Sequence, residues 1–198
     1  QTHAALINPA IRNAQRAQTD WHQLGASERA RILNSAADLY EANAGELFAM
    51  LAREAGKTIQ DAIAELREAV DFLRYYAAQA EKIATSKRPC GVMACISPWN
   101  LPLYLFTWKI APALAAGNTV VAKPSEVTPM TAFLLSKICE KIGLPKGVLN
   151  IVHGLGGSTG QAIIEHEDIK AISFTGGTAT GGAGRGDRGG CAGRQVYS

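Results

Sequence analysis

Asn100 lies at the centre of the first segment whose residue types could do chemistry. It follows an apolar run that ends at Ile96, and it stands between Pro98 and Pro102. Two prolines stiffen the backbone, so a side-chain amide between them is presented with little loss of entropy on binding. Such an amide can donate a hydrogen bond to an oxygen that becomes negatively charged during a reaction. The alternative interpretation is that Asn100 caps a helix beginning near Pro102.

Lys123 and Glu126 follow a second apolar run. At the end of a strand, their opposite charges can hold the two hydroxyl groups of a ribose, with the ammonium donating and the carboxylate accepting. The alternative is an incidental ion pair in a solvated loop, which contributes little to stability.

Glycines follow a third and a fourth apolar run. The candidate residues for contact with a phosphate or a cofactor are Gly156, Gly157, Gly176 and Gly177. Glycine lets backbone N–H groups approach a phosphate at the positive end of a helix. The first pair departs from the G-x-G-x-x-G dinucleotide fingerprint, because Thr159 occupies the sixth position. Each of the four predicted strands is thus followed by groups suited to bind an oxyanion, a ribose or a phosphate. Together, these four segments favour nucleotide binding.

The elements that must position these residues alternate between strands and helices. The predicted strands are 91–96, 119–122, 148–152 and 171–174, and the predicted helices between them are 102–116, 129–142 and 158–165. Strands that are apolar on both faces and separated by helices indicate a doubly wound α/β domain with a parallel sheet, here over residues 86–180. Ligands of such sheets bind beyond the carboxyl ends of the strands, where all the candidate residues lie.

Residues 1–85 form a predicted helical region that precedes the sheet. Ser27 is expected to cap one helix, and Gly56 is expected to end another. From Ile59 to about Ile83, apolar residues recur at steps of three and four, which indicates one long amphipathic helix. The charged residues on its other face, Glu65 among them, are expected to be solvated.

Composition excludes several classes of protein. The chain has 198 residues, a net charge of +3 and 47% hydrophobic residues, which fits one folded domain and gives no sign of a polyanion partner. Its four cysteines form no CxxC pair, so no metal site is expected. The absence of a signal peptide and of a long apolar run favours a cytoplasmic protein with free thiols and no membrane contact.

Four ordered segments closely resemble the NAD(P)-dependent aldehyde dehydrogenase superfamily. They are residues 96–100, 108–118, 122–126 and 173–176, with the sequences ISPWN, WKIAPALAAGN, AKPSE and SFTG. The resemblance implies an α/β fold with a Rossmann-like parallel sheet and an N-terminal helical region, in a truncated form of the family fold. It also implies that residues 86–180 bind NAD or NADP, that residues 1–85 are the helical part of the same domain, and that residues 6–10 form an opening strand.

The same resemblance implies a role for each candidate residue. Asn100 would donate to the oxyanion of the thiohemiacetal. The cofactor-binding residues would be Pro98 and Trp99 at the cleft, Lys123 and Glu126 at the adenosine ribose, Gly156 and Gly157 beside the adenine half, and Gly176 and Gly177 at the pyrophosphate. Gly177 replaces a serine that is usual in the family, and Lys109 matches a family lysine that is either structural or part of a proton relay.

The catalytic half of the family mechanism is absent from these residues. That mechanism needs a cysteine thiolate to attack the aldehyde and a glutamate in a Glu-Leu-Gly-Gly-Lys motif to assist hydrolysis, and neither motif is present. We therefore expect the chain alone to be inactive. The resemblance implies that its parent oxidises a small aldehyde to a carboxylic acid. It also implies that the protein can form a homo-oligomer. Residues 52–79 resemble the pyrroline-5-carboxylate branch, and residues 90–132 resemble muconic-semialdehyde enzymes.

Residues 181–198 form a predicted irregular tail rich in glycine and arginine. The codons for residues 195–198 can encode Lys-Phe-Thr-Leu when the reading frame is shifted by one base. That sequence resembles the family segment just before Glu-Leu-Gly-Gly-Lys, so we expect the tail to be a frameshift product. Two other functions stay open at this stage: a non-catalytic nucleotide-binding or interaction module, and a nucleic-acid binder acting through the tail. The second is disfavoured, because the tail lacks aromatic residues between its arginines, so no nucleic-acid partner is expected.

Overall fold

A parallel sheet forms the centre of the molecule. The computed structural model describes residues 4–86, 88–177 and 195–197. Its strands are β1 (Val92–Ile96), β2 (Thr119–Lys123), β3 (Leu149–Ile151), β4 (Ala171–Phe174) and β5 (Gln195–Tyr197). They lie in the order β3-β2-β1-β4-β5, and every neighbouring pair is parallel. The doubly wound α/β fold predicted from the sequence is confirmed.

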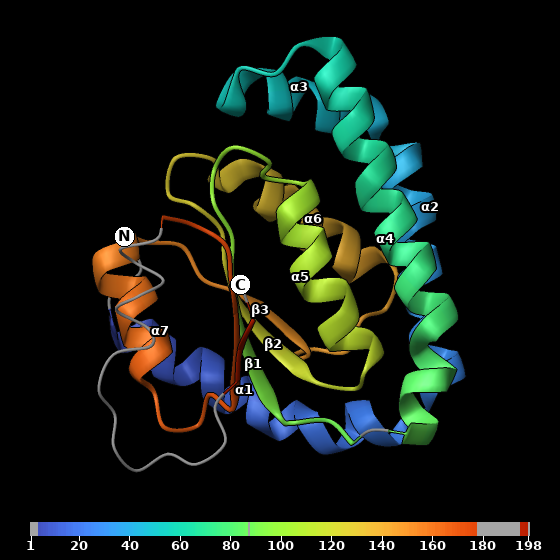
Figure 1. Ribbon diagram of the computed structural model, residues 1–198, viewed down its shortest axis with the longest axis vertical. Helices are drawn as coiled ribbons and strands as arrows, with labels where there is room; N and C mark the ends of the chain where they lie inside the picture. The colour runs from blue at the N-terminus through green and yellow to red at the C-terminus, as the bar shows by residue number, and fades with distance from the viewer. Residues whose placement is uncertain (1–3, 87, 178–194, 198) are drawn as a thin grey trace.

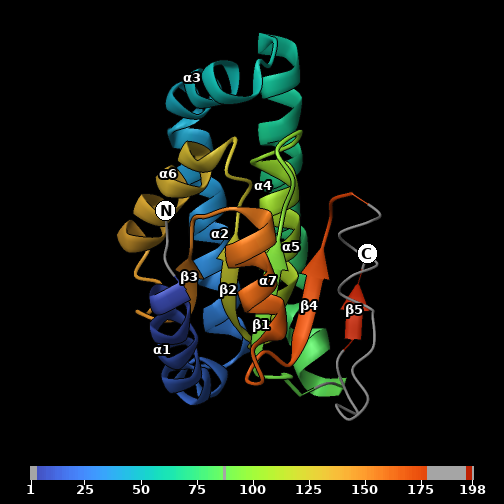
Figure 2. The ribbon, with the colours of Figure 1, turned by 90° about the vertical axis from the view of Figure 1, so that its left-hand side faces the viewer.

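Helices cover both faces of this sheet. The helices α1 (Ala4–Gln23) and α7 (Gln161–Glu165) lie on one face, as Figure 2 shows. On the other face lie α2 (Ala26–Ala42), α4 (Ile59–Ser86), α5 (Tyr104–Ala115) and α6 (Pro129–Lys141), with α3 (Ala44–Ala55) beyond the carboxyl ends of the strands (Figure 1). The two-sided coverage explains why the strands are apolar throughout.

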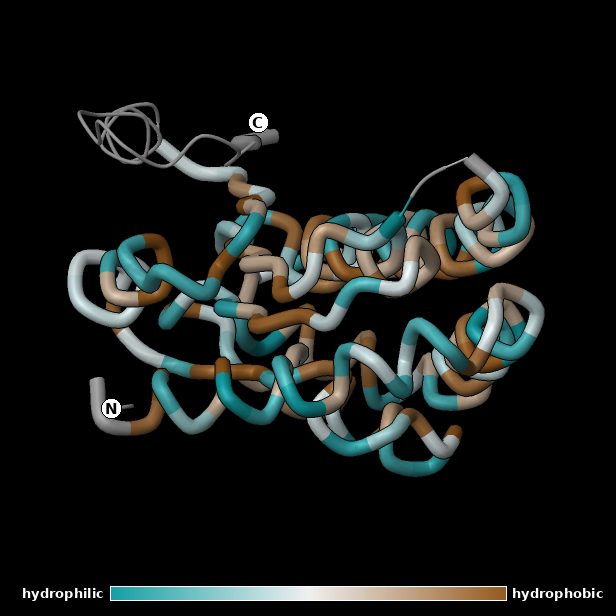
Figure 3. The backbone as a smooth tube through the Cα atoms, turned by 90° about the horizontal axis from the view of Figure 1, so that it is seen from below, coloured by the Kyte–Doolittle hydropathy of each residue, from teal (hydrophilic) through white to brown (hydrophobic). Residues whose placement is uncertain are grey.

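Side chains of the interior strand β2 alternate between two apolar cores. Val120 and Ala122 are buried with residues of α2, α4 and α5, whereas Val121 is buried with Ile7 and Ile11 of α1. This alternation follows from the two-residue period of a strand. Brown hydrophobic and teal hydrophilic stretches alternate along the helices in Figure 3, because each helix turns one apolar stripe toward a core.

The opening strand expected over residues 6–10 is wrong, because these residues lie in α1. Ile7, Ile11 and Ala14 are all at most 2% exposed, and their steps of four and three place them on one face of a helix. Pro9 lies near the start of this helix, where the loss of one backbone N–H removes a single hydrogen bond. Burial of that face against the sheet therefore decides the conformation of the segment.

Helix starts and stops agree with the sequence in part. The predicted cap at Ser27 is wrong, because α2 begins at Ala26 and the Ser27 hydroxyl instead donates to Glu81 Oε1 at 2.6 Å. Gly56 ends α3 as predicted, with a left-handed φ of 63° that glycine adopts without strain. The predicted helix over 158–165 is a π-helical turn, Gly156–Gly160, followed by α7.

The tail contributes one short strand to the sheet. Residues 195–197 pair with β4 in parallel register, so these three residues differ from the irregular conformation expected for residues 181–198. The Gly/Arg-rich part of that tail, up to residue 194, lies outside the described residues.

Candidate functional site at the carboxyl edge of the sheet

The segments that carry the candidate residues meet at one edge of the sheet. Ser97 N donates to Lys123 O at 3.2 Å, and Thr175 N donates to Ile96 O at 3.1 Å. The end of β1 therefore lies between the ends of β2 and β4. Since carboxyl ends of parallel strands share one edge, the loops after these strands lie next to one another.

Lys123 and Glu126 form an ion pair at the end of β2. Lys123 Nζ lies 3.1 Å from Glu126 Oε2 and donates to Pro124 O at 2.9 Å, which uses two of its three N–H donors. The Lys123 side chain is 2% exposed and that of Glu126 is 39% exposed, so the carboxylate faces the solvent side of the pair. A hydroxyl group that approaches the pair from solvent meets the exposed carboxylate, an acceptor, while the ammonium behind it keeps one N–H that Glu126 and Pro124 do not use.

Glu126 also binds the loop that follows β3. Its Oε1 accepts a hydrogen bond from Gly156 N at 3.4 Å. Burial alone would raise the pKa of this carboxyl group, but hydrogen bonds from its own backbone N–H, from Lys123 and from Gly156, with the charge of Lys123, together lower it. The carboxylate is therefore ionised at neutral pH. It links the loop that follows β2 to the loop that follows β3.

Asn100 does not cap the helix after it, so that alternative is wrong. Helix α5 begins at Tyr104, with Leu103 at its N-cap position. The Asn100 side chain is exposed and has no hydrogen-bond partner within the described residues. Pro98 is half-buried beside it and Trp99 is 55% exposed, so this segment presents an amide and an indole at the edge of the sheet.

The candidate glycines differ in what their own packing requires. A Cβ atom added at Gly156, Gly157 or Gly177 would meet nothing within 4 Å, so the protein's own packing does not account for these glycines. A Cβ at Gly176 would lie 2.6 Å from the Phe174 ring. Open backbone at the first three positions suits close approach of a ligand, whereas a side chain at Gly176 would require the Phe174 ring to shift.

Lys109 lies under the site, on the face of the sheet that α5 covers. It is 6% exposed and its Nζ donates to Ser173 Oγ at 3.2 Å. Burial lowers the pKa of Lys109, while the neighbouring Cys95 raises it. Lys109 and Ser173 line a cavity of about 690 Å³ together with Trp108 and Thr175. The position is compatible with either role that the sequence left open for this lysine.

The structure also identifies a residue that sequence reasoning missed. Glu65 was expected on a solvated face of α4, but it is 3% exposed. Its Oε1 accepts hydrogen bonds from Leu103 N at 2.8 Å and Tyr104 N at 3.1 Å. These donors lie almost forty residues further along the chain, so helical periodicity gave no sign of them. The one available signal in the sequence was that Glu65 is adjacent to Leu66, a residue of the apolar stripe of α4.

The Cys95 thiol is buried and the Cys139 thiol is partly buried, both among apolar residues. Burial raises the pKa of Cys95 and the pKa of Cys139 to about 12 each, so neither forms a nucleophilic thiolate at neutral pH. Cys90 is exposed and unbridged, and Cys191 lies outside the described residues. Across residues 4–86 and 88–177, no group of three His, Cys, Asp or Glu residues could hold a metal ion. Among the helices described, none is both long and apolar enough to cross a bilayer.

Comparison with known proteins gives one consistent result. The profile of the Aldehyde dehydrogenase family matches residues 1–183. The chain is 44% identical over 193 residues to 2-aminomuconic semialdehyde dehydrogenase of Danio rerio, which covers 89% of the chain and 39% of that protein. It is 45% identical over 176 residues to the bifunctional protein PutA of Klebsiella aerogenes, over 88% of the chain and 13% of that protein.

Solved structures agree with the sequence comparison. The crystal structure of PnpE from Pseudomonas sp. WBC-3 superposes with a TM-score of 0.90 at 39% identity, over 93% of the chain and 41% of the PnpE chain. The chain thus spans about two fifths of the length of the semialdehyde dehydrogenase that it matches.

Proposed function

The chain belongs to the aldehyde dehydrogenase family, and we propose that it is the cofactor-binding part of an NAD(P)-dependent aldehyde dehydrogenase. The parent reaction would convert an aldehyde to a carboxylic acid. The name of one similar protein, 2-aminomuconic semialdehyde dehydrogenase, supports a small semialdehyde as the parent's substrate.

The observation that carries this proposal is the set of contacts around Glu126. One carboxylate oxygen pairs with Lys123 Nζ and the other accepts from Gly156 N. A ribose needs adjacent acceptors and donors for its two hydroxyl groups, and this pair offers both at the carboxyl edge of the sheet. The pair thus suits the adenosine ribose of a dinucleotide.

The residues present fit such a cofactor. The backbone of Gly156, Gly157 and Gly177 faces open space, which leaves room for a ligand against it. Exposed Trp99 would form one wall of the cleft beside Pro98. When bound, the nicotinamide accepts a hydride from the substrate. The free amide of Asn100 would donate a hydrogen bond to the substrate oxygen as negative charge develops on it.

Glu126 favours NAD over NADP. Its carboxylate is ionised and partly exposed, so it accepts from a free ribose hydroxyl and repels a phosphate at the same position. We expect NAD to bind more tightly than NADP for this reason.

Turnover needs a thiolate near Asn100, at the carboxyl edge of the sheet, and the described cysteines do not offer one. The Cys95 and Cys139 thiols are protonated at neutral pH, and the exposed Cys90 precedes β1 and so lies at the opposite edge of the sheet. A chain limited to these 198 residues would therefore bind cofactor without oxidising aldehydes. We propose that such a chain acts in a homo-oligomer or together with intact members of the family.

Isothermal titration of NAD and NADP into the purified chain tests this function. We expect saturable NAD binding, weaker NADP binding, and a smaller difference between the two in a Glu126→Gln variant. A Glu140→Gln variant is the matched control, because Glu140 lies on α6 with its side chain 71% exposed. Absence of binding to either dinucleotide would reject the proposal in favour of an interaction module without cofactor. Formation of NADH with a semialdehyde would reject the expected inactivity.

A further inference from the structure

Two glutamates of the helical region reach across to the loops of the candidate site. Glu65 of α4 accepts hydrogen bonds from the first backbone N–H groups of α5. Glu54 of α3 accepts from Met130 N at 2.8 Å and from Thr131 N at 3.1 Å, at the start of α6. Helix α5 follows the Asn100 segment and helix α6 follows the Lys123–Glu126 segment, so each glutamate holds the far end of one functional loop.

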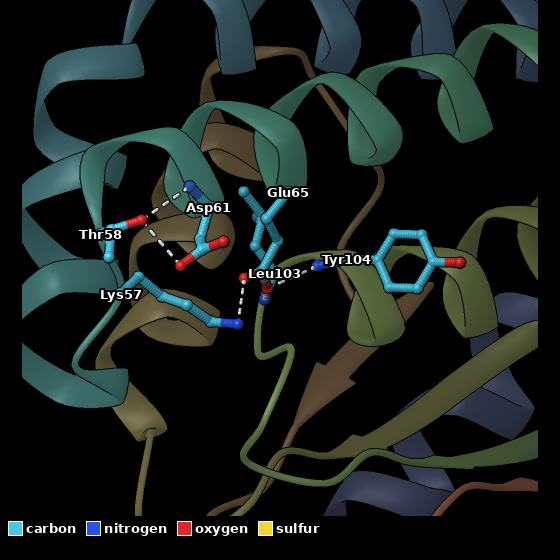
Figure 4. A network of polar contacts seen from close by, with 6 residues as sticks. All are labelled: Lys57, Thr58, Asp61, Glu65, Leu103 and Tyr104. Carbon is cyan, nitrogen blue, oxygen red and sulfur yellow. Dashed lines mark hydrogen bonds and ion pairs between the residues drawn. The ribbon is translucent and has the colours of Figure 1, made fainter.

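The carboxylate of Glu65 is buried between the two helices. Lys57 Nζ lies 3.6 Å from Glu65 Oε2, and the Lys57 side chain is 16% exposed (Figure 4). Burial raises the pKa of Glu65, whereas the N–H groups of Tyr104 and Leu103 and the charge of Lys57 lower it. Burial has the largest effect, so the pKa of Glu65 is raised overall, and its Oε2 is buried without a hydrogen-bond donor. Lys57 and the two N–H donors therefore compensate the cost of burying this group only in part.

A local cap would have been sufficient to stabilise a helix end. At the start of α4, Thr58 Oγ1 accepts from Asp61 N at 3.2 Å and donates to Asp61 Oδ2 at 2.7 Å, so an exposed local side chain caps this helix (Figure 4). By contrast, α5 has no side-chain cap of its own and depends on a buried group from α4. The consequence of the distant cap is a rigid link between α4 and the loop that leads into α5.

That link reaches Asn100 through a short, stiff segment. Leu103 is three residues beyond Asn100, and Pro102 between them is buried. The other end of the loop is fixed by the hydrogen bond from Ser97 N to Lys123 O. With both ends held, the loop that presents Asn100 has few conformations left.

We propose that Glu65 is a positioning residue for Asn100, acting through the hydrogen bonds that its carboxylate oxygen accepts from Leu103 N and Tyr104 N. The consequence for catalysis rests on the proposed function, since it assumes that Asn100 donates to the substrate oxygen. The positioning itself is a property of the chain without cofactor.

Nuclear magnetic resonance of the whole ¹⁵N-labelled chain, without cofactor, tests the proposal on two variants. Glu65→Asp keeps the charge near Lys57 but shortens the side chain, so its oxygen cannot reach both N–H groups. We expect amide exchange at Leu103 and Tyr104 to accelerate about tenfold, and the backbone order parameters of Trp99 and Asn100 to fall toward those of a flexible loop. Glu65→Gln keeps an acceptor oxygen at full length, and we expect it to retain the native values.

Glu54→Asp is the matched control, because the same shortening should accelerate exchange at Met130 and Thr131 and leave Asn100 ordered.

Native order at Trp99 and Asn100 in Glu65→Asp would overturn the proposal and reduce Glu65 to a helix cap. Loss of order in Glu65→Gln would also overturn it, since charge and not the acceptor would then hold the loop. If Glu65→Asp does not fold, the Glu65→Gln result decides. None of these readouts uses NAD, so failure of the titration above would leave this test intact.

Discussion

At the scale of single residues, the structure of the carboxyl edge depends on a buried charge, Lys123, whose partners lie within three residues of it in the sequence. Lys123 is almost fully buried, and it is stabilised by Glu126 Oε2 and Pro124 O. An ion pair with one exposed member contributes modestly to stability, because water screens the exposed charge. Its larger value is geometric, since it fixes the direction of a donor and an acceptor that a ligand can use.

This pair makes the stability of the protein depend on pH. The pKa of Glu126 is lowered in the folded protein, so its ionised form stabilises the fold at pH values above the unfolded value of about 4.3. That contribution is lost as the pH falls through the lowered pKa of the folded state. In urea unfolding at pH 7, we expect Glu126→Gln to cost between a few tenths and about 1 kcal/mol, with the difference from the native chain vanishing in acid. A difference that persists unchanged below pH 3 would contradict this account.

At the scale of elements, local sequence determined much of the structure. The strands β1, β2 and β4 and the helices α4, α5 and α6 lie within about three residues of their expected bounds, because runs of Val and Ile or a clear helical period mark them. The expectation for residues 6–10 failed because it relied on resemblance, while the helical spacing of Ile7, Ile11 and Ala14 indicated a helix.

The residues that sequence reasoning missed depend on long-range contacts. Glu65 was interpreted as a solvated charge because its donors, the N–H groups of Leu103 and Tyr104, come from another element. Likewise, the interpretation of Asn100 as a cap failed because the cap of α5 is supplied from α4. For the site itself, the order of strands placed Asn100, Lys123 and Glu126 at one edge, which the sequence predicted from the parallel sheet alone.

Arg29 joins the helical region to the end of α5. It is 1% exposed, and its guanidinium donates to Ala115 O at 3.1 Å and to His22 O at 3.0 Å. Its replacement in Arg29→Met removes the side-chain donor to Ala115 O and leaves His22 O with only the hydrogen bond from Gly25 N, so we expect a loss of about 3 kcal/mol in the free energy of unfolding. Arg31→Met is the control on the same helix. The Arg31 side chain is 58% exposed, so we expect a change within about 0.5 kcal/mol. Equal effects of the two variants in urea unfolding would contradict the role of Arg29.

At the scale of the whole molecule, the helical region and the sheet share one core. Tyr40 of α2 and Leu73 of α4 are buried in the same apolar cluster as Phe106 of α5 and Val120 of β2. The Tyr40 hydroxyl lies 3.1 Å from Thr107 Oγ1, and Trp21 Nε1 donates to Leu114 O at 3.2 Å. The helices α1 to α4 therefore pack with the sheet and α5 as one unit.

A shared core should unfold in one step. We expect the urea transitions followed by far-ultraviolet circular dichroism, which reports the helices, and by tryptophan fluorescence to coincide. Trp21 and Trp108 report the contact between the helical region and α5. Two separated transitions would mean that the helical region and the sheet are independent units.

The most direct test of the central claim is a crystal structure of the chain with NAD. We expect the adenosine ribose at the end of β2, with its hydroxyl groups about 3 Å from Lys123 Nζ and from the Glu126 carboxylate. Gly156 should lie next to the adenine half, and Asn100 should remain free to bind a substrate oxygen. NAD bound away from the carboxyl edge, or an empty edge at a saturating concentration of NAD, would contradict the account.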